Sequence, residues 1–502
     1  MGNKRGITEE LFKNSFWNFG TTFANRIGAL FFTILVARFL LPELFGVYNL
    51  IIAITFIFLT LSDFGVNTAL LKYFSEHFGN NNVQKAKAYL NYLSKLKISL
   101  LLFFSIVLLS SAYFLAFYVF QKPLLFIPLL LSSFYLVILG LEEFYSFLFY
   151  PLNKVNYRFY KEVFFQALRI ILLFLITISF VGRNKLEMIM LVLILSSLLV
   201  LLFVLLLVKK IFPKTKIRKK FSLDKQEVLR FIKYLAIGGL SLIFFSNIDI
   251  IMLGIFISDT SYVGFYRAAF SIVAGISGLL VFSNLLLPAF VRVKKNRINI
   301  AFNKVVKFIC MLSIPATFGI IVLGKYVIRF LYGYEYLLAV IPLYILAFVI
   351  VESGLTGAYY SLLVSKNKPQ MYVKSLVGAT LINFILNFVL ILSLKNISEI
   401  WAVVGATIAT VFSRYFYLLN MVFLSKKYFK LKFNLSYILK PIGASFLMAL
   451  IMLYSINLLG DINLFNGLFE IFLGIVAYFI FLFLIKGIEI EDFVLVKQIF
   501  YK

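Results

Sequence analysis

Residues 186–220 read LEMIMLVLILSSLLVLLFVLLLVKKIFPKTKIRKK, a long apolar run followed at once by a cluster of basic residues. The run over 186–208 exceeds the roughly 20 apolar residues that a helix needs to span a bilayer. The basic residues that follow are typical of a cytoplasmic loop, because Lys and Arg are retained on that side of a membrane. The same pattern of apolar run and basic loop recurs along the chain and predicts a membrane protein.

The composition of the whole chain leads to the same conclusion. Of its 502 residues, 62% are hydrophobic and only 14% are charged, and the mean hydropathy is +0.99. Soluble domains average about 45–50% apolar and about 25% charged residues. So few charged groups cannot cover a surface that faces water, whereas lipid can face apolar side chains directly. We therefore expect an all-α polytopic membrane protein.

Hydropathy windows of about 20 residues predict the number of membrane spans. Residues 1–10 lack the features of a signal peptide, so the first apolar segment is expected to remain in the mature protein. The fourteen apolar segments lie at 14–38, 46–70, 96–119, 124–149, 163–181, 186–208, 234–256, 264–290, 305–324, 336–364, 370–393, 401–424, 438–459 and 466–486.

Basic residues are distributed very unevenly between alternate loops. Of the 49 Lys and Arg residues, 38 fall on the side that carries both termini, 7 on the other side and 4 inside spans. This asymmetry predicts a multi-pass protein of the cytoplasmic membrane with cytoplasmic N- and C-termini. The net charge of +28, including the basic run over 209–220, is explained by topology and attraction to anionic lipid, so no nucleic-acid partner is expected.

Several kinds of chemistry are excluded by residues that the sequence lacks. Cys310 is the only cysteine and His77 the only histidine, which excludes a disulfide framework, most zinc sites and histidine-based catalytic triads. The chain also has no P-loop motif. Outer loops of at most about a dozen residues leave no room for an external catalytic domain. We expect no catalytic residue, no metal site and no cofactor.

Two pairs of short motifs indicate an internal repeat. Gly46-x-Tyr48 recurs as Gly264-x-Tyr266 at an offset of 218, and Asn153-Lys154 recurs as Asn367-Lys368 at an offset of 214. Six spans separate the members of each pair, which preserves their orientation. The expected architecture is two pseudo-symmetric six-helix lobes followed by a helix pair: an N-lobe at 1–208, a basic cytoplasmic linker at 209–233, a C-lobe at 234–424, and spans 13–14 with the tail at 425–502.

Several stretches resemble polysaccharide-type flippases of the MOP exporter superfamily. They are ARFLLPELFGVY at 37–48, DFGVNTAL at 63–70, VGFYRAA at 263–269, FLYGYEY at 330–336 and VGATIAT at 404–410. The resemblance covers the first twelve spans. It implies a transporter, not an enzyme, that moves a polyprenyl-pyrophosphate-linked oligosaccharide, such as an O-antigen precursor, from the cytoplasmic to the outer leaflet by alternating access.

The resemblance also implies partners and leaves alternatives open. The partners are the lipid-linked oligosaccharide, membrane lipids, H⁺ or Na⁺ as coupling ion, and glycan-assembly enzymes. The cargo could instead be lipid II or another lipid-linked glycan. Two further alternatives are a MATE-type exporter of cationic drugs, which needs an acidic cavity, and a membrane-embedded glycan polymerase or ligase, which needs an outer catalytic surface.

Arg26 is the strongest candidate for substrate binding. It lies twelve residues from both Asn14 and Arg38, and an ionisable group at such depth costs roughly 2.5–3.5 kcal/mol unless it faces a cavity. A guanidinium there suits a pyrophosphate, and we expect it inside a cationic, water-filled chamber. The alternative is a polar stripe that hydrogen-bonds to neighbouring helices. The substrate-binding candidates, taken from this stripe and from the eighth span, are Arg26, Arg267, Asn18, Thr22 and Asn25, and the stripe also holds Asn14 and Thr21.

Carboxylates inside spans are candidates for ion coupling or for pairing with a cation. Asp63 and Asp249 are the coupling candidates. For Glu142 and Glu143 we favour pairing. Arg169 is expected to snorkel to the interface, Asn383 and Asn387 to hold helices together, and Arg414 and Glu352 have no assigned role.

Overall fold

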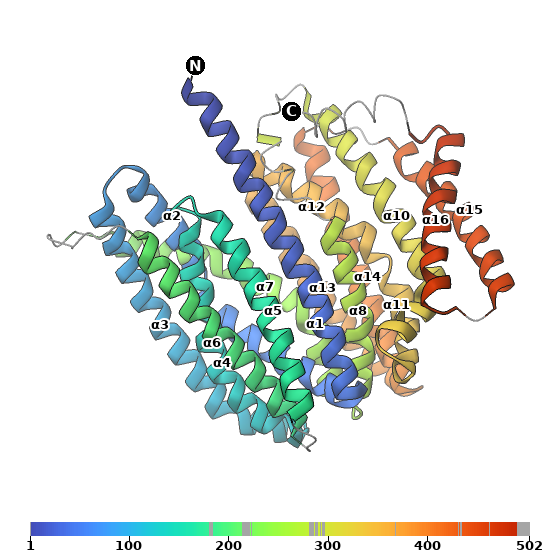
Figure 1. The fold of residues 1–502 in the computed structure, drawn as a ribbon, viewed down its shortest axis with the longest axis horizontal. Coiled ribbons are helices and arrows are strands. Elements are labelled where there is room, and N and C mark those ends of the chain that lie inside the picture. The colour runs from blue at the N-terminus through green and yellow to red at the C-terminus, as the bar shows by residue number, and fades with distance from the viewer. Residues whose placement is uncertain are drawn as a thin grey trace. The chain divides into compact units, whose positions relative to one another are not determined.

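The computed structural model describes most of the chain as helices (Figure 1). The described residues are 2–179, 184–212, 223–280, 297–366, 368–429, 434–460 and 462–488, with single positions at 221, 286, 290, 291, 293 and 431. Parts of five predictions lie outside them. They are residues 180–181 of the fifth span, 213–220 and 222 of the linker, 281–285 and 287–289 of the eighth span, Asn367 of the second repeat, and the tail from 489 onward.

The described residues form helices and no strand, which confirms the predicted all-α class. Short π or 3-10 turns join some of the helices. They are η1 (Leu115–Val119), η2 (Pro123–Leu125), η3 (Phe147–Phe149) and η5 (Tyr334–Ala339). The helices are α1 (Gly2–Asp63), α2 (Val66–Gly79), α3 (Val83–Phe114), α4 (Phe126–Ser146), α5 (Val155–Ser179), α6 (Lys185–Ile211), α7 (Lys225–Phe256), α8 (Ser261–Leu280), α10 (Ile298–Leu331), α11 (Val340–Leu346), α12 (Val349–Ser365), α13 (Pro369–Lys395), α14 (Glu399–Phe429), α15 (Ser436–Leu459) and α16 (Leu464–Leu484).

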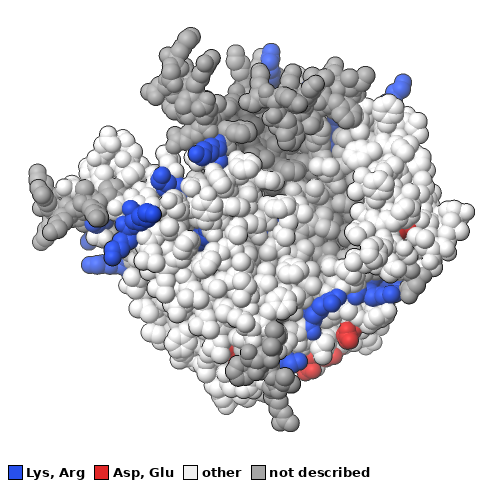
Figure 2. All heavy atoms as spheres, in the orientation of Figure 1, with Lys and Arg blue, Asp and Glu red and all other residues white. Residues whose placement is uncertain are grey.

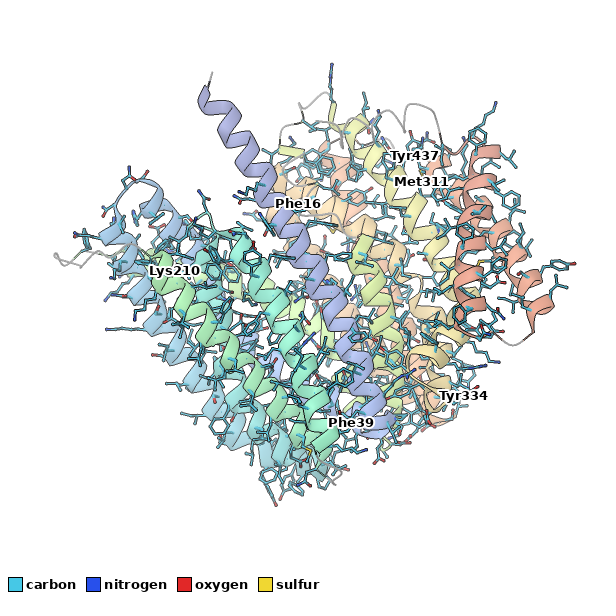
Figure 3. All side chains as sticks on the ribbon, viewed as in Figure 1. Phe16, Phe39, Lys210, Met311, Tyr334 and Tyr437 are labelled. Carbon is cyan, nitrogen blue, oxygen red and sulfur yellow. The ribbon has the colours of Figure 1, made fainter. Side chains whose placement is uncertain are left out.

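Helix α1 is broken near its middle. Leu41 has a φ of 64° and a ψ of 170°, outside the helical region. It precedes Pro42, whose ring disfavours the helical conformation of the residue before it. Within the first half, the stretch between Phe16 and Phe39, both labelled in Figure 3, corresponds to the first predicted span. The second half continues into α2 through Gly65, whose φ of 91° is accessible to glycine at little cost.

The number of helices that could span a membrane is close to, but lower than, the fourteen predicted segments. Among the described residues, eleven helices are long and apolar enough to cross a membrane, or twelve if the bent pair Tyr334–Leu346 and Val349–Ser365 is one span. The first two predicted segments share one continuous run, Phe16–Gly79. The segment at 163–181 corresponds to α5, which is outside that count. Most side chains on the face in Figure 2 are neither basic nor acidic, as lipid contact requires.

The helices group into two compact units. The first comprises Met1–Arg267 and Leu376–Ala406, and the second comprises Ala268–Ser375 and Thr407–Lys502. In the first unit α1 packs against α5 and α7, and α4 packs against α3 and α6. In the second unit α10 packs against α12 and α15, and α15 against α16. The predicted lobe boundaries stay a prediction.

The repeated glycines meet in the first unit. A Cβ on Gly46 would lie 1.9 Å from the carbonyl oxygen of Thr260, and a Cβ on Gly264 would lie 2.3 Å from that of Pro42. Pro42 and Thr260 are themselves 218 residues apart, like the two glycines, so the contact is reciprocal. Only glycine permits backbones to approach this closely. The motif found in the sequence therefore marks a reciprocal contact in space.

Many basic residues that the hydropathy pattern assigns to loops lie in helices, and two of the buried ones are Lys97 and Lys161. Lys97 is within α3 and Lys161 within α5, and both are buried. The loop assignment of Lys161 was wrong because α5 begins at Val155, well before the predicted segment at 163–181. Lys97 stands at the edge of its predicted segment, 96–119, but well inside α3, which begins at Val83. A buried ammonium needs an anionic partner, and each lysine has one in the cavity described next.

Candidate functional site

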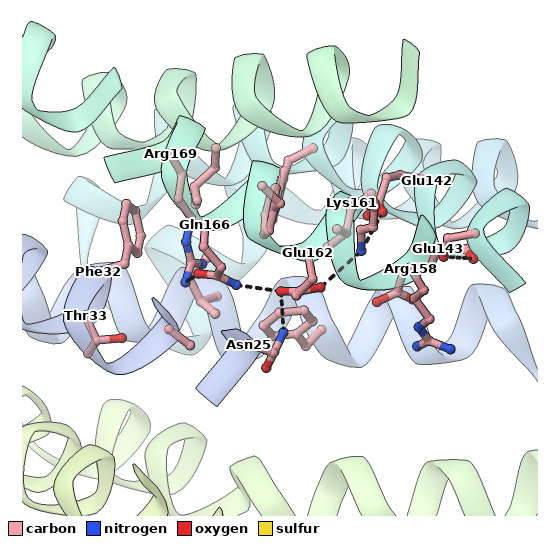
Figure 4. A pocket seen from close by; sticks show the side chains of 18 of the residues that line it. Asn25, Phe32, Thr33, Glu142, Glu143, Arg158, Lys161, Glu162, Gln166 and Arg169 are labelled. Atoms are coloured by element: carbon pink, nitrogen blue, oxygen red, sulfur yellow. Dashed lines mark hydrogen bonds and ion pairs between the residues drawn. The ribbon is translucent and has the colours of Figure 1, made fainter. Parts of the chain in front are cut away.

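A cavity of about 570 Å³ lies within the first unit (Figure 4). Both halves of α1 and residues of α2, α4 and α5 form its wall, with one residue each from α6 and α8. Eight ionisable side chains line it. They are the basic residues Arg158, Lys161, Arg169 and Arg267 and the acidic residues Asp63, Glu142, Glu143 and Glu162.

One face of α5 supplies much of this charged wall. Arg158, Glu162, Gln166 and Arg169 are spaced by four, four and three residues, which places them on one side of a helix. Figure 4 shows them following one another along α5. The sequence analysis missed this face because it began the span at residue 163. The spacing itself was a usable signal.

Lys161 joins α5 to α4. Its Nζ lies 2.7 Å from Oε1 of Glu142 and 3.3 Å from Oε2 of Glu162. The three side chains are at most 10% exposed, so each charge depends on the others for compensation. The predicted pairing of Glu142 is confirmed, and its partner is a lysine.

Glu162 joins α5 to α1. Its Oε1 accepts hydrogen bonds from Nδ2 of Asn25 at 2.7 Å and from Nε2 of Gln166 at 2.6 Å. Gly28 lets the two helices approach, because a Cβ there would lie 2.6 Å from Cγ of Gln166. Asn25 is therefore the member of the predicted α1 stripe that reaches this network.

Arg169 lies at the far end of the α5 face. Its guanidinium donates to Oε1 of Gln166, and its Cζ lies 4.3 Å from the ring centroid of Phe32 and 5.2 Å from that of Phe165. The residue is buried. The expectation that Arg169 snorkels to the interface was wrong, because its guanidinium hydrogen-bonds to an amide oxygen and lies against two aromatic rings inside the unit.

Asp63 lines the cavity at the junction of α1 and α2. Its Oδ1 lies 2.7 Å from Nζ of Lys97, and its carboxylate accepts hydrogen bonds from the backbone N–H groups of Gly65 and Asn67 at 3.3 Å. It therefore caps α2 and compensates a buried ammonium. These contacts give it a structural role beside the predicted coupling role, which stays untested.

Asp249 lies outside the cavity wall but within the same unit. It accepts hydrogen bonds from Oη of Tyr266 at 2.8 Å and from Nδ2 of Asn387 at 2.6 Å. Nδ2 of Asn387 also lies 2.5 Å from Oδ1 of Asn383. These contacts tie α7, α8 and α13 together and confirm for Asn387 the prediction that it holds helices together, whereas the bond between Asn383 and Asn387 lies within α13.

The other predicted binding residues divide into two groups. Arg267 lines the cavity with Asn25, whereas Arg26, Asn18 and Thr22 do not. Arg26 is exposed, and Oγ1 of Thr22 donates within its own helix to the carbonyl oxygen of Asn18 at 2.9 Å. The structure thus brings part of the predicted set together, and the binding roles stay predictions.

The second unit contains a separate buried pair. Arg414 Nη1 lies 3.6 Å from Oε2 of Glu352, whose other oxygen accepts a hydrogen bond from Thr356 at 2.6 Å. Glu352 is almost completely buried. This arrangement matches the alternative in which a carboxylate within a span pairs with an arginine.

The charged side chains of the first-unit cavity balance one another. Among the described residues, no group of three or more His, Cys, Asp or Glu side chains could hold a metal ion. The four basic and four acidic residues of the wall balance in formal charge. This cavity is therefore not cationic by formal charge, and the expected cationic chamber stays a prediction.

Comparison with known proteins gives one family match and one curated relative. A family model described as polysaccharide biosynthesis protein matches residues 11–294, more than half of the chain. The chain is 26% identical over 276 residues to Agl15, a probable low-salt glycan biosynthesis flippase of Haloferax volcanii. That match covers 53% of this chain and 55% of Agl15, little more than half the length of the relative.

Solved structures share the fold. The lipid II flippase MurJ in an inward closed conformation superposes with a TM-score of 0.68 and 21% identity, over 93% of this chain and 97% of MurJ. An inward-facing MATE multidrug transporter of the MOP superfamily gives 0.64 and 13% identity, over 82% and 95%. At these identities the likeness concerns the fold alone. The resemblance noted in the sequence is confirmed.

Proposed function

The chain belongs to the family of polysaccharide biosynthesis proteins, and from this membership we propose that it is a transporter of a lipid-linked oligosaccharide. It moves the head group from the cytoplasmic to the outer leaflet of the cytoplasmic membrane, with both termini in the cytoplasm, for the assembly of a surface polysaccharide. The similarity to Agl15 supports this function. A polyprenyl-diphosphate carrier and alternating access between two six-helix lobes are parts of the proposal.

The main support for this proposed function is the charged cavity of the first unit. Ionisable side chains inside a membrane protein are costly and are typical of substrate or ion pathways. A lipid-linked oligosaccharide has anionic phosphates and many hydroxyl groups. Cations bind the phosphates, and carboxylates accept hydrogen bonds from hydroxyls. A wall with both signs of charge suits such a head group.

The same balance disfavours export of cationic drugs. A site for cations needs an excess of negative charge, whereas the four basic side chains of this wall offset its four acidic ones. Lipid II stays a possible cargo, since its diphosphate would engage the same cations. A glycan polymerase or ligase stays a weaker alternative, because the predicted outer loops are short.

Individual roles within the proposal follow from the residues. Arg267 binds the diphosphate from the cavity wall. Arg26, which is exposed and lies outside that wall, contacts the diphosphate at another point of its passage, with Asn18, Thr22 and Asn25 as polar neighbours. Asp63 and Asp249 are the sites at which H⁺ or Na⁺ couples to transport. At Asp63 a proton would break the ion pair with Lys97, which would remove one contact between α1 and α3.

A flipping assay tests the function. The purified protein is placed in vesicles that contain a fluorescent polyprenyl-diphosphate-linked oligosaccharide, and dithionite reports the fraction of label in the outer leaflet. We expect movement between leaflets well above that of protein-free vesicles. Movement at the protein-free rate, or transport of a cationic dye in its place, would contradict the proposal.

A further inference from the structure

Arg158 differs from the other two cations on the cavity face of α5. The ammonium of Lys161 lies between two carboxylates. The guanidinium of Arg169 donates to an amide oxygen through Nη2, although its Nε is buried without an acceptor among the described residues. Nη1 of Arg158 is buried, and none of the described residues accepts a hydrogen bond from it. A buried donor on a charged group gains more than a neutral one from an acceptor. The cavity therefore contains a cation that is available to a ligand.

The turn between α4 and α5 holds this guanidinium in place. Its Cζ lies 4.6 Å from the ring centroid of Tyr150 and 5.2 Å from that of Phe147. Two backbone hydrogen bonds close the turn, from Asn153 N–H to Tyr150 O at 3.0 Å and from Lys154 N–H to Phe149 O at 2.8 Å. An aromatic ring against a guanidinium covers its face and leaves its N–H edge for acceptors in the same plane.

We propose that Arg158 binds the diphosphate of the lipid-linked substrate as it enters the cavity, an inference that rests on the proposed function. Two N–H groups of the planar guanidinium can donate to two phosphate oxygens at once. A diphosphate has enough further oxygens to bind other donors at the same time. Arg158 lies in the first turn of α5, at the end that the charge distribution predicts to be cytoplasmic. The substrate would therefore meet it before the deeper residues of the wall.

The test measures binding of farnesyl diphosphate to the purified full-length protein in detergent by isothermal titration calorimetry. We expect Arg158→Ala to raise the Kd by about 10- to 100-fold, as the loss of a charge-assisted hydrogen-bonded pair would. Arg158→Lys keeps the charge but loses the fork, so its Kd should fall between those of the wild type and Arg158→Ala. Equal Kd values for the wild type and Arg158→Ala would overturn the inference.

Lys154→Ala is the matched control. Lys154 is exposed, lies one helical turn before Arg158 and does not line the cavity, so its loss should leave the Kd within about twofold. An equal weakening by Lys154→Ala would mean that only overall charge matters and would overturn the inference. Arg158→Gln, close in size, replaces Arg158→Ala if that variant unfolds, as judged by its melting temperature.

Two further measurements separate the inference from the function. Inorganic pyrophosphate should bind much more weakly than farnesyl diphosphate. Equal affinity would mean that Arg158 binds soluble diphosphates and would overturn the inference that its ligand is lipid-linked. The wild type could flip the labelled lipid in the vesicle assay while Arg158→Ala flips and binds it equally well. That outcome would refute the inference but not the proposed function. A wild type that neither binds nor flips would refute both.

Discussion

Two polar faces, on α1 and on α5, look alike in sequence but have different surroundings. The α1 face runs through Asn18, Thr22 and Arg26, and it is partly exposed and bonded within its own helix. The α5 face runs from Arg158 to Arg169 and is bonded to two other helices. Helical periodicity identifies a polar face, but the packing partner decides whether that face builds a cavity.

The largest effect should come from Lys161, at the centre of the α5 face. Lys161→Met leaves Glu142 and Glu162 buried without their shared cation, which should cost about 3–5 kcal/mol of stability. The loss is measured as a lower melting temperature of the purified protein in detergent. Adding Glu142→Gln should recover part of it, and a double variant no more stable than Lys161→Met would argue against the pairing.

The close approach of the two faces depends on Gly28. Gly28→Leu forces a side chain into the space of Gln166, and overpacking of this kind should cost about 1–3 kcal/mol. The readout is the same melting temperature. Gln166→Ala in the same chain makes room and should reduce the penalty, while an unchanged Gly28→Leu protein would show that α1 and α5 are not in tight contact.

Asn25 is the direct link between the faces. Asn25→Ala removes one hydrogen bond to the Glu162 carboxylate, and because Asn25 is exposed the loss should be about 1 kcal/mol. Asn25→Asp, which places a second carboxylate beside Glu162, should destabilise the protein more than Asn25→Ala. The opposite order would contradict the observed bond.

Arg26, the neighbour of Asn25, should have the smallest effect on stability. Its side chain is exposed, so Arg26→Ala should change stability by no more than about 0.5 kcal/mol. If it holds the substrate head group as proposed, the same variant should abolish glycan export at an unchanged protein level and topology. Normal export in an Arg26→Ala strain would remove Arg26 from the proposed site.

Periodicity and charge pointed to only part of the cavity wall in advance, and the strongest candidate, Arg26, lies outside that wall. They singled out Asn25, Asp63 and Arg267, all of which line the cavity, and the repeat that brings Gly46 to Gly264. They misjudged Lys97, Lys161 and Arg169, since each was assigned by its position relative to the end of an apolar segment. A buried partner on another helix can hold a charged side chain inside the protein wherever it stands along its segment. Hydropathy values do not show which helices meet, so they cannot predict such a partner.

The sequence alone was sufficient for the fold class and the approximate number of spans, because lipid requires an apolar surface on every helix that crosses it. The tertiary structure decided which polar faces meet. A salt bridge such as Lys161 to Glu142 joins residues from different helices, and its energy depends on a separation and burial that arise only when those helices pack.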